Sequence, residues 1–427
     1  MDWIMDGMPL LKVSVAFLCM LLLIKKGVHL SLSILTGCVA MGLLFGMRPK
    51  AWGEAALAGV TGETTVYLAL IVVTILVLSD VMSKTGQTER LMGVLAAYIR
   101  HPRLRLVFFP VLIGLLPMPG GAVFSAPMVE SAALNMQIDE RRKTLINYWF
   151  RHVWEISWPL YPGLILASSL AGVPITHIVA YAWIGMPLMV ALGWFFFLRP
   201  GVLPLPPEAY ETDETLVRRH GQLFRLGLPY LIAIVGALGL EMLIASAFPE
   251  WPFELGVVTA LALSILCALL QNRVAPGMVF RLVFSGSVVK MIAIIISIFV
   301  FKEVLQRAGA VEELARMAGG DVALFASAVF LPFVVGVIAG INVAYVGAAF
   351  PLMLGLLRTM GMESQTMAYV MLALVVGFAG VMVSPMHICF VLTCQYFGES
   401  LARPWRRLVL PCTLLLLFGV GYWAALL

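Results

Sequence analysis

Charged residues are scarce in this chain. Only 12% of its 427 residues are Asp, Glu, Lys or Arg, while 61% are hydrophobic. The mean hydropathy is +0.99. No soluble domain needs this much apolar surface, so the composition predicts an all-α polytopic membrane protein whose surroundings are the lipid bilayer. The net charge of +5 is modest, and we interpret it as loop bias toward one membrane face rather than affinity for nucleic acid.

Cysteine is also rare, and no cysteine pair has the spacing of a metal or redox site. The chain has six cysteines, all inside apolar runs, and Cys389 and Cys394 are five residues apart. We expect them to be small buried apolar residues. The sequence has no zinc-type motif and no nucleophile elbow, so it predicts neither a cofactor nor an enzyme.

Ten apolar stretches are long enough to cross a bilayer, which takes about 20 helical residues. We expect spans at residues 8–24, 29–46, 64–83, 143–171, 176–198, 226–247, 253–271, 281–305, 365–396 and 407–426. The most polar stretch, residues 199–225, is rich in proline and then in charge, which predicts a solvated linker. It separates a first repeat at residues 1–198 from a second at 226–427.

Two segments that interrupt apolar sequence repeat each other along the chain. Residues 114–124, which contain Pro-Met-Pro-Gly-Gly, correspond to residues 340–350 at an offset of 226. The same offset carries Pro159 to Pro385 and Gly172 to Gly398, and an offset of 223 carries the Asp80 segment to that of Glu303. Paired interruptions in two halves are a pointer to the binding site of a secondary transporter.

The remaining apolar regions, 104–136 and 322–358, each suit two short helices, and we predict re-entrant hairpins there. Five crossings and one hairpin per repeat give the repeats inverted topology. Sorting the Lys and Arg residues on this topology puts 20 on one face and 7 on the other, with Lys290 in mid-span. The positive-inside rule then places the linker in the cytoplasm and both termini outside it.

The hairpin tips are the first candidate binding elements. Proline and glycine suit a backbone turn at membrane depth, and the helix that follows presents free N–H groups that favour an anion. The alternative is a proline kink in an ordinary helix. The predicted substrate-binding residues at the tips are Pro119, Gly120, Gly121, Ser125, Asn342, Tyr345 and Gly347.

Broken helices at 143–171 and 365–396 are the second candidate element. Each proline removes a backbone donor and frees an upstream carbonyl, so these breaks suit substrate or a sodium ion near Ser157, Pro159, Ser384 and Pro385. Simple kinks without chemistry are the alternative. The predicted substrate-binding residues of the breaks are Ser157, Tyr161, Ser384 and His387.

Ionisable residues inside apolar segments are functional hypotheses by default. Lys290 is predicted to bind substrate, with Glu155 or Glu241 as its alternative partner in a structural ion pair. His387 is either a proton-gating residue or a hydrogen-bonded core histidine. Glu155, close to Arg151 in sequence, suits a structural ion pair as well as ion coupling. For Glu130 we expect a structural hydrogen bond.

The order of spans, hairpin, broken helix and second copy resembles the ion transporter superfamily, which includes gluconate, C4-dicarboxylate, citrate and arsenite permeases. The string from Leu116 to Met128 resembles an uncharacterised prokaryotic family of that superfamily, domain of unknown function 401. The resemblance implies a scaffold domain and a moving transport domain, an elevator-type movement, a homodimer and the prokaryotic cytoplasmic membrane. The Ser-Asn-Thr tips of the sodium-coupled dicarboxylate branch are absent from this sequence.

We therefore expect a secondary active transporter of a small organic anion of carboxylate type, coupled to protons or sodium. An intramembrane enzyme is the first alternative, because His152, His177, His387, Glu155 and Ser157 offer suitable groups. An anion channel is the second. A membrane component that docks partners through residues 199–225 ranks last.

Overall fold

The computed structural model describes residues 8–99, 101–115, 121–134, 136–210, 220–248, 250–252, 254–274, 276–316 and 320–427, and all regular structure in these ranges is helical. The first half contains α2 (Met8–Lys25), α3 (Leu30–Leu44), α4 (Pro49–Thr61), α5 (Glu63–Lys84), α6 (Gln87–Ala96), α7 (Pro102–Gly114), α8 (Ala122–Ala132), α9 (Glu140–Arg151), α10 (Pro162–Ala171), α11 (Ile175–Ala182), α12 (Gly185–Gly193), η1 (Trp194–Leu198) and η2 (Pro207–Tyr210). The all-α prediction is confirmed.

The second half contains α13 (His220–Ala247), α14 (Glu254–Asn272), α15 (Pro276–Val283), α16 (Gly286–Arg307), α17 (Ala310–Arg316), α18 (Gly320–Phe325), η3 (Ala326–Phe330), α19 (Leu331–Ala339), α20 (Asn342–Thr359), η4 (Glu363–Gln365), α21 (Thr366–Met382), α22 (Ile388–Tyr396) and α23 (Ala402–Leu426).

Eight helices of the described chain are long and apolar enough to cross a membrane, or nine if a pair bent by 42° at residues 277–307 is one span. The polytopic class is therefore confirmed, although these numbers are below the ten spans we expected. The stretch 29–46 forms only the 15-residue α3, and the stretch 143–171 is broken between α9 and α10. The first arm of the second hairpin, Asp321–Ala339, is by contrast long enough to cross.

The repeat seen in the sequence reappears in the helix boundaries. The bounds of α5 and α16 are displaced by 223 residues at both ends, and the starts of α9 and α21, and of α10 and α22, by 226. Matched glycines end corresponding helices with positive φ: Gly86 and Gly309 near 70°, and Gly172 and Gly398 near 68°. Glycine adopts this left-handed conformation without a Cβ penalty. The two halves therefore share one order of helices and breaks.

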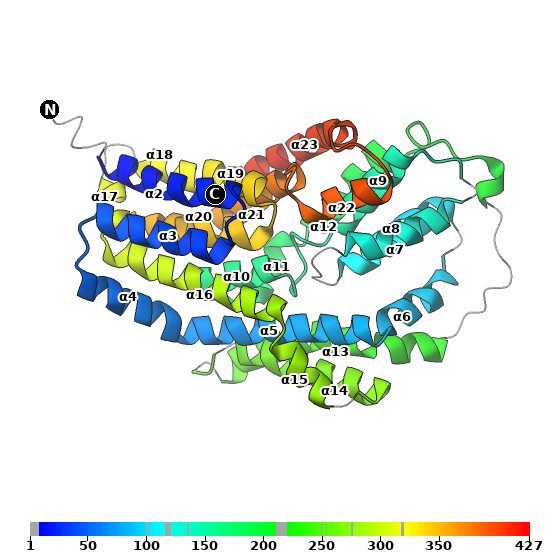
Figure 1. Cartoon of the computed structure of the whole chain (residues 1–427), viewed down its shortest axis with the longest axis horizontal. Coiled ribbons are helices and arrows are strands. Elements are labelled where there is room, and N and C mark those ends of the chain that lie inside the picture. The colour runs from blue at the N-terminus through cyan, green and yellow to red at the C-terminus, as the bar shows by residue number, and fades with distance from the viewer. Residues whose placement is uncertain are drawn as a thin grey trace.

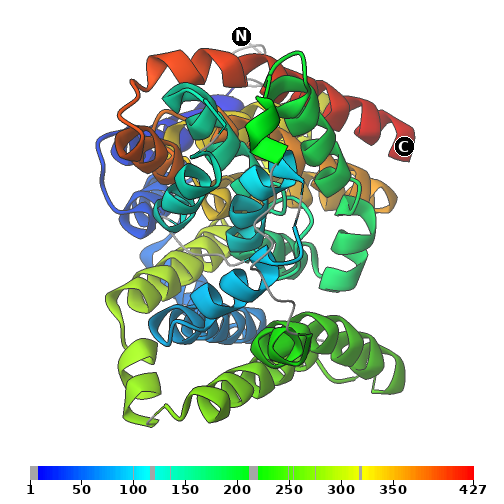
Figure 2. The ribbon, with the colours of Figure 1, turned by 90° about the vertical axis from the view of Figure 1, so that its right-hand side faces the viewer.

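In Figure 1, α2, α3, α4 and α16 lie at one end of the molecule, and α7, α8, α9 and α22 lie at the other. In the turned view, α13 and α14 form a layer of their own, and α14 packs against α5 (Figure 2). On the other side, α7, α8, α9 and α22 pack against one another. Helix α20 is buried without interruption from Val343 to Leu357, and α21 from Ala368 to Met382. Helices that are apolar all round occupy the core of such an assembly.

Arginines of α7 fix the chain after the first repeat. Arg103 is 5% exposed and donates to the carbonyl oxygens of Leu198 and Leu203, while Arg105 donates to that of Ala209. The linker predicted at 199–225 therefore begins with an anchored segment. Its residues 211–219 lie outside the described part of the chain.

Candidate binding site at the two helix breaks

Both predicted helix breaks are present. In the first repeat, α9 ends at Arg151, and turns over residues 152–161 precede α10, whose first residue is Pro162. In the second repeat, α21 ends at Met382, and residues 383–387, which include Pro385, precede α22. A proline cannot donate to the preceding turn, and Pro385 follows the end of α21 by three residues, whereas α9 ends eight residues before Pro159. Two matched positions depart from regular helix geometry.

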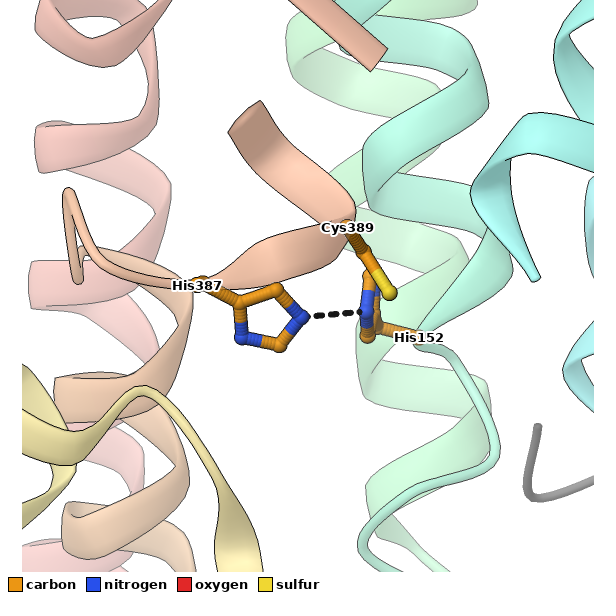
Figure 3. A group of neighbouring side chains, drawn as sticks. All are labelled: His152, His387 and Cys389. Atoms are coloured by element: carbon orange, nitrogen blue, oxygen red, sulfur yellow. Dashed lines mark hydrogen bonds between the residues drawn. The ribbon is translucent and has the colours of Figure 1, made fainter. Parts of the chain in front are cut away.

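One histidine from each helix break forms a hydrogen bond with the histidine of the other break. The Nε2 atoms of His152 and His387 lie 3.0 Å apart, and the two rings cross at 81° (Figure 3). Nδ1 of His152 lies 2.5 Å from the Tyr148 carbonyl oxygen, which only accepts, so this nitrogen carries a proton. In the neutral pair His152 Nε2 then accepts, and His387 Nε2 donates. Nδ1 of His387 is buried and has no hydrogen-bond partner among the described residues.

Glu155 joins this pair to the tip of the second hairpin. Its Oε1 lies 3.6 Å from His152 Nε2, and its Oε2 accepts a 2.8 Å hydrogen bond from Nδ2 of Asn342, the first residue of α20. The Glu155 side chain is only 11% exposed. Gly163 allows α10 to approach the start of α20 closely, since a Cβ at this position would lie only 2.9 Å from the Asn342 Cβ. A carboxylate of the first repeat is thus held by an amide of the second.

Arg151 supplies the positive charge of the cluster. It is 2% exposed, its guanidinium hydrogen-bonds the Tyr161 hydroxyl, and its charge acts on Glu155. The Tyr161 hydroxyl in turn donates to the Gly114 carbonyl oxygen at 2.6 Å. Gly121, at the other end of the first hairpin tip, leaves room for Arg151, since a Cβ there would lie 2.6 Å from its Nη2. Arg151 therefore sits between the first hairpin and the first helix break.

Five side chains therefore define what we call the central cluster. They come from both repeats: Arg151, His152, Glu155, Asn342 and His387. Two of these, Asn342 and His387, are among the predicted substrate-binding residues, and for Glu155 the sequence leaves a structural ion pair and ion coupling open. Arg151 is not among the predicted site residues, because charge sorting places it on the Lys/Arg-rich membrane face. The signal for it was present: Arg, His and Glu at positions 151, 152 and 155 of an apolar broken span.

Other predicted site residues serve the packing around this cluster. The Tyr345 hydroxyl donates to the Leu374 carbonyl oxygen, and Gly347 leaves room for Ile298. Ser125 and Ser157 are buried. Ser384 Oγ donates to the Val337 carbonyl oxygen at 2.6 Å and accepts from the Met386 N–H at 3.1 Å. Pro119 and Gly120 lie outside the described residues.

Lys290 occupies a different place from the one expected. It is exposed on the second turn of α16, and no hydrogen bond or ion pair within the described ranges includes it. Its expected partners are engaged elsewhere: Glu155 with Asn342, and Glu241 with the N–H groups of Ile175 and Thr176. The structure thus does not bring Lys290 together with either carboxylate. Glu130 accepts a 2.6 Å hydrogen bond from the Tyr396 hydroxyl, the structural role expected for it.

The histidine pair also lies near a thiol, which raises the question of a metal. The ligand atoms of His152, His387 and Cys389 lie within 4.8 Å of one another, and all three residues are buried (Figure 3). However, the two histidine nitrogens already form a hydrogen bond with each other, and the charge of Arg151 acts on both rings and repels a cation. The geometry therefore fits a hydrogen-bonded pair better than a metal centre.

Fold and site together define a polytopic helical membrane protein with duplicated helix breaks that meet at a buried polar cluster. A family model described as "Protein of unknown function (DUF401)" matches residues 10–425, and the chain belongs to this family. No curated protein matches the chain. The family predicted from the segment at 116–128 is confirmed.

Proposed function

We propose that this protein is a secondary active transporter of a small organic anion, with the central cluster as its substrate site. One observation carries the proposal: two broken helices and a hairpin tip from different repeats converge on one buried set of polar groups. Irregular backbone at membrane depth persists where it lines a site, and intramembrane charges mark substrate or ion pathways. Arg151 is the group that suits a carboxylate, because its planar guanidinium matches carboxylate geometry.

The charges of the cluster favour protons as the coupling ion. Arg151 and Glu155 sum to zero while both histidines are neutral, so a bound monoanion would leave one uncompensated buried negative charge. One proton on His152, His387 or Glu155 restores neutrality. These three groups lie together, with His152 Nε2 at 3.0 Å from His387 and 3.6 Å from Glu155. Each negative charge carried would then require one proton.

Sodium is the weaker candidate for coupling. The predicted sodium site needs oxygen ligands at the breaks, but Ser384 Oγ is already engaged in two hydrogen bonds. No Ser-Asn-Thr sequence supplies others.

Crevices beside the first hairpin support an elevator-type movement. One, of about 500 Å³, is lined by Met92 of α6 and by Phe108 and Met128 of the hairpin. A second, of about 270 Å³, lies between Leu91, Leu112 of α7 and Phe224 of α13. A hairpin that packs loosely against α6 and α13 can slide past them. We further propose that the protein is a homodimer in a prokaryotic cytoplasmic membrane, with both termini outside the cytoplasm.

Reconstituted protein tests the proposal. A thermal-shift screen of gluconate, lactate, succinate and citrate selects the probe, because a ligand of the native state raises apparent stability. Proteoliposomes with an alkaline lumen should then accumulate the radiolabelled probe, and a protonophore should abolish accumulation. An imposed sodium gradient at equal pH should not drive it. Equilibration of the probe without accumulation under any gradient would instead support the channel alternative.

A further inference from the structure

A basic pocket lies away from the central cluster, between the start of α9, the end of η1 and the start of α23. It is a cavity of about 300 Å³ with three arginines at its wall: Arg141 and Arg142 of α9 and Arg407 of α23. Leu145, Phe196 and Phe197 provide its apolar lining. Three segments far apart in sequence therefore build one concave site with guanidinium groups beside aromatic rings.

The positive charge of this pocket exceeds its local compensation. Arg142 Nη1 lies 3.2 Å from Asp139 Oδ2, and Arg141 Nη2 lies 4.0 Å from the same oxygen. Two guanidiniums thus share one carboxylate. Arg407 is exposed and forms no ion pair among the described residues. The pocket keeps a net charge of about two, and its guanidinium forks match the oxygens of a phosphate.

The apolar lining distinguishes the ligand from a free ion. Leu145 and Phe197 are buried in the wall, and Phe196 is half-buried beside them. An inorganic anion gains nothing from such a surface, whereas a phosphodiester that carries glycerol and acyl carbons contacts it. The arginines also belong to the membrane face predicted to hold most Lys and Arg. Basic pockets between membrane helices on that face recognise anionic headgroups.

We propose that this pocket binds the phosphodiester headgroup of an anionic phospholipid, with its arginines on the phosphate. The bound lipid would bridge α9, which carries the first helix break, to α23. These two helices already pack against each other. Binding therefore stabilises the arrangement of the helix that positions Arg151. This role does not depend on which substrate is carried.

Native mass spectrometry of the full-length protein in detergent tests the proposal. Wild-type protein should retain dioleoyl phosphatidylglycerol in preference to dioleoyl phosphatidylcholine. Arg142→Gln and Arg407→Gln should each weaken phosphatidylglycerol binding about fivefold, because one arginine near an anionic headgroup contributes about that factor. Arg406→Gln is the matched control: it removes an exposed arginine next to Arg407 that does not line the pocket, and binding should stay at the wild-type level.

Three outcomes would overturn the assignment. Equal retention of the two lipids would show that the pocket does not distinguish an anionic headgroup from a zwitterionic one. Equal loss in Arg406→Gln and Arg407→Gln would show diffuse surface attraction. Displacement of the lipid by millimolar inorganic phosphate would make the pocket a free-phosphate site. Arg142→Lys is the control for misfolding of Arg142→Gln, because it keeps the positive charge. Its affinity for phosphatidylglycerol should lie between that of the wild type and that of Arg142→Gln.

Discussion

Nε2 of His152 and Nε2 of His387 lie 3.0 Å apart although 235 residues separate them in the chain. This bond joins the helix break of the first repeat to that of the second. Its direction is set by the Tyr148 carbonyl oxygen, which holds the proton of His152 on Nδ1. A protonated His152 Nε2 could no longer accept a hydrogen bond from the His387 N–H. It would donate instead to the Glu155 carboxylate, whose Oε1 lies 3.6 Å away. The two breaks are thus connected through one titratable nitrogen.

The histidine pair predicts energetic coupling between the breaks. His152→Ala and His387→Ala should each lower the free energy of unfolding by about 1–3 kcal/mol, because each leaves a buried polar partner unsatisfied. The double variant should cost less than the sum of the two, with a coupling of about 0.5–3 kcal/mol. Denaturant unfolding of the four proteins measures this cycle. His177→Ala, at an exposed position, is the control and should change stability little. Strict additivity would contradict the paired arrangement.

The buried charges predict a rescue experiment. Arg151→Gln leaves Glu155 without its compensating charge and should destabilise the protein by about 3–5 kcal/mol. Arg151→Gln combined with Glu155→Gln removes both charges and should recover most of that loss. Neither protein should accumulate the anionic probe, because the guanidinium that holds the carboxylate is gone. Unfolding measurements and proteoliposome uptake separate the two effects. A double variant with normal uptake would exclude Arg151 from the substrate site.

Local sequence was enough to predict where the helix breaks lie, since Pro159 and Pro385 lack a backbone N–H wherever the fold places them. The repeat was equally readable, because glycines such as Gly172 and Gly398 recur at one offset. The central cluster was only partly predictable. The contact of Asn342 with Glu155 spans 187 residues and depends on helix packing that no local pattern encodes.

Charge was the weakest guide to position. Sorting by membrane face treats every Lys and Arg as solvated, so Arg151 was counted with the surface although it is buried. Conversely, hydropathy alone sets the start of the predicted span near residue 281 and so places Lys290 deep in the membrane. In the structure the chain bends before α16, which begins at Gly286, so Lys290 lies on the second turn of its helix.

Replacement of Gly340 by alanine should lower the free energy of unfolding more than the same replacement at Gly398. Gly340 has φ +65°, and a Cβ there would lie 2.9 Å from the His387 Cα. Gly398 has φ +67° but nothing within 4 Å of a Cβ. Gly398→Ala should therefore cost about 1–2 kcal/mol from the backbone conformation alone. Gly340→Ala should cost about 1–3 kcal/mol more through the clash, and should reduce transport by displacing His387. Equal unfolding free energies for the two variants would contradict the close approach.

Lys290 provides the sharpest contrast between sequence and structure. The sequence predicts a substrate-binding lysine, for which Lys290→Gln would abolish uptake, whereas the structure places this side chain at an exposed position, outside the central cluster. We therefore expect Lys290→Gln to keep uptake of the anionic probe near the wild-type rate and to change stability by less than about 0.5 kcal/mol. The matched comparison is Arg151→Gln, which removes one positive charge from the buried cluster and should abolish uptake. If Lys290→Gln instead loses uptake while its unfolding stays unchanged, the substrate passes α16, and the site must be extended toward that helix.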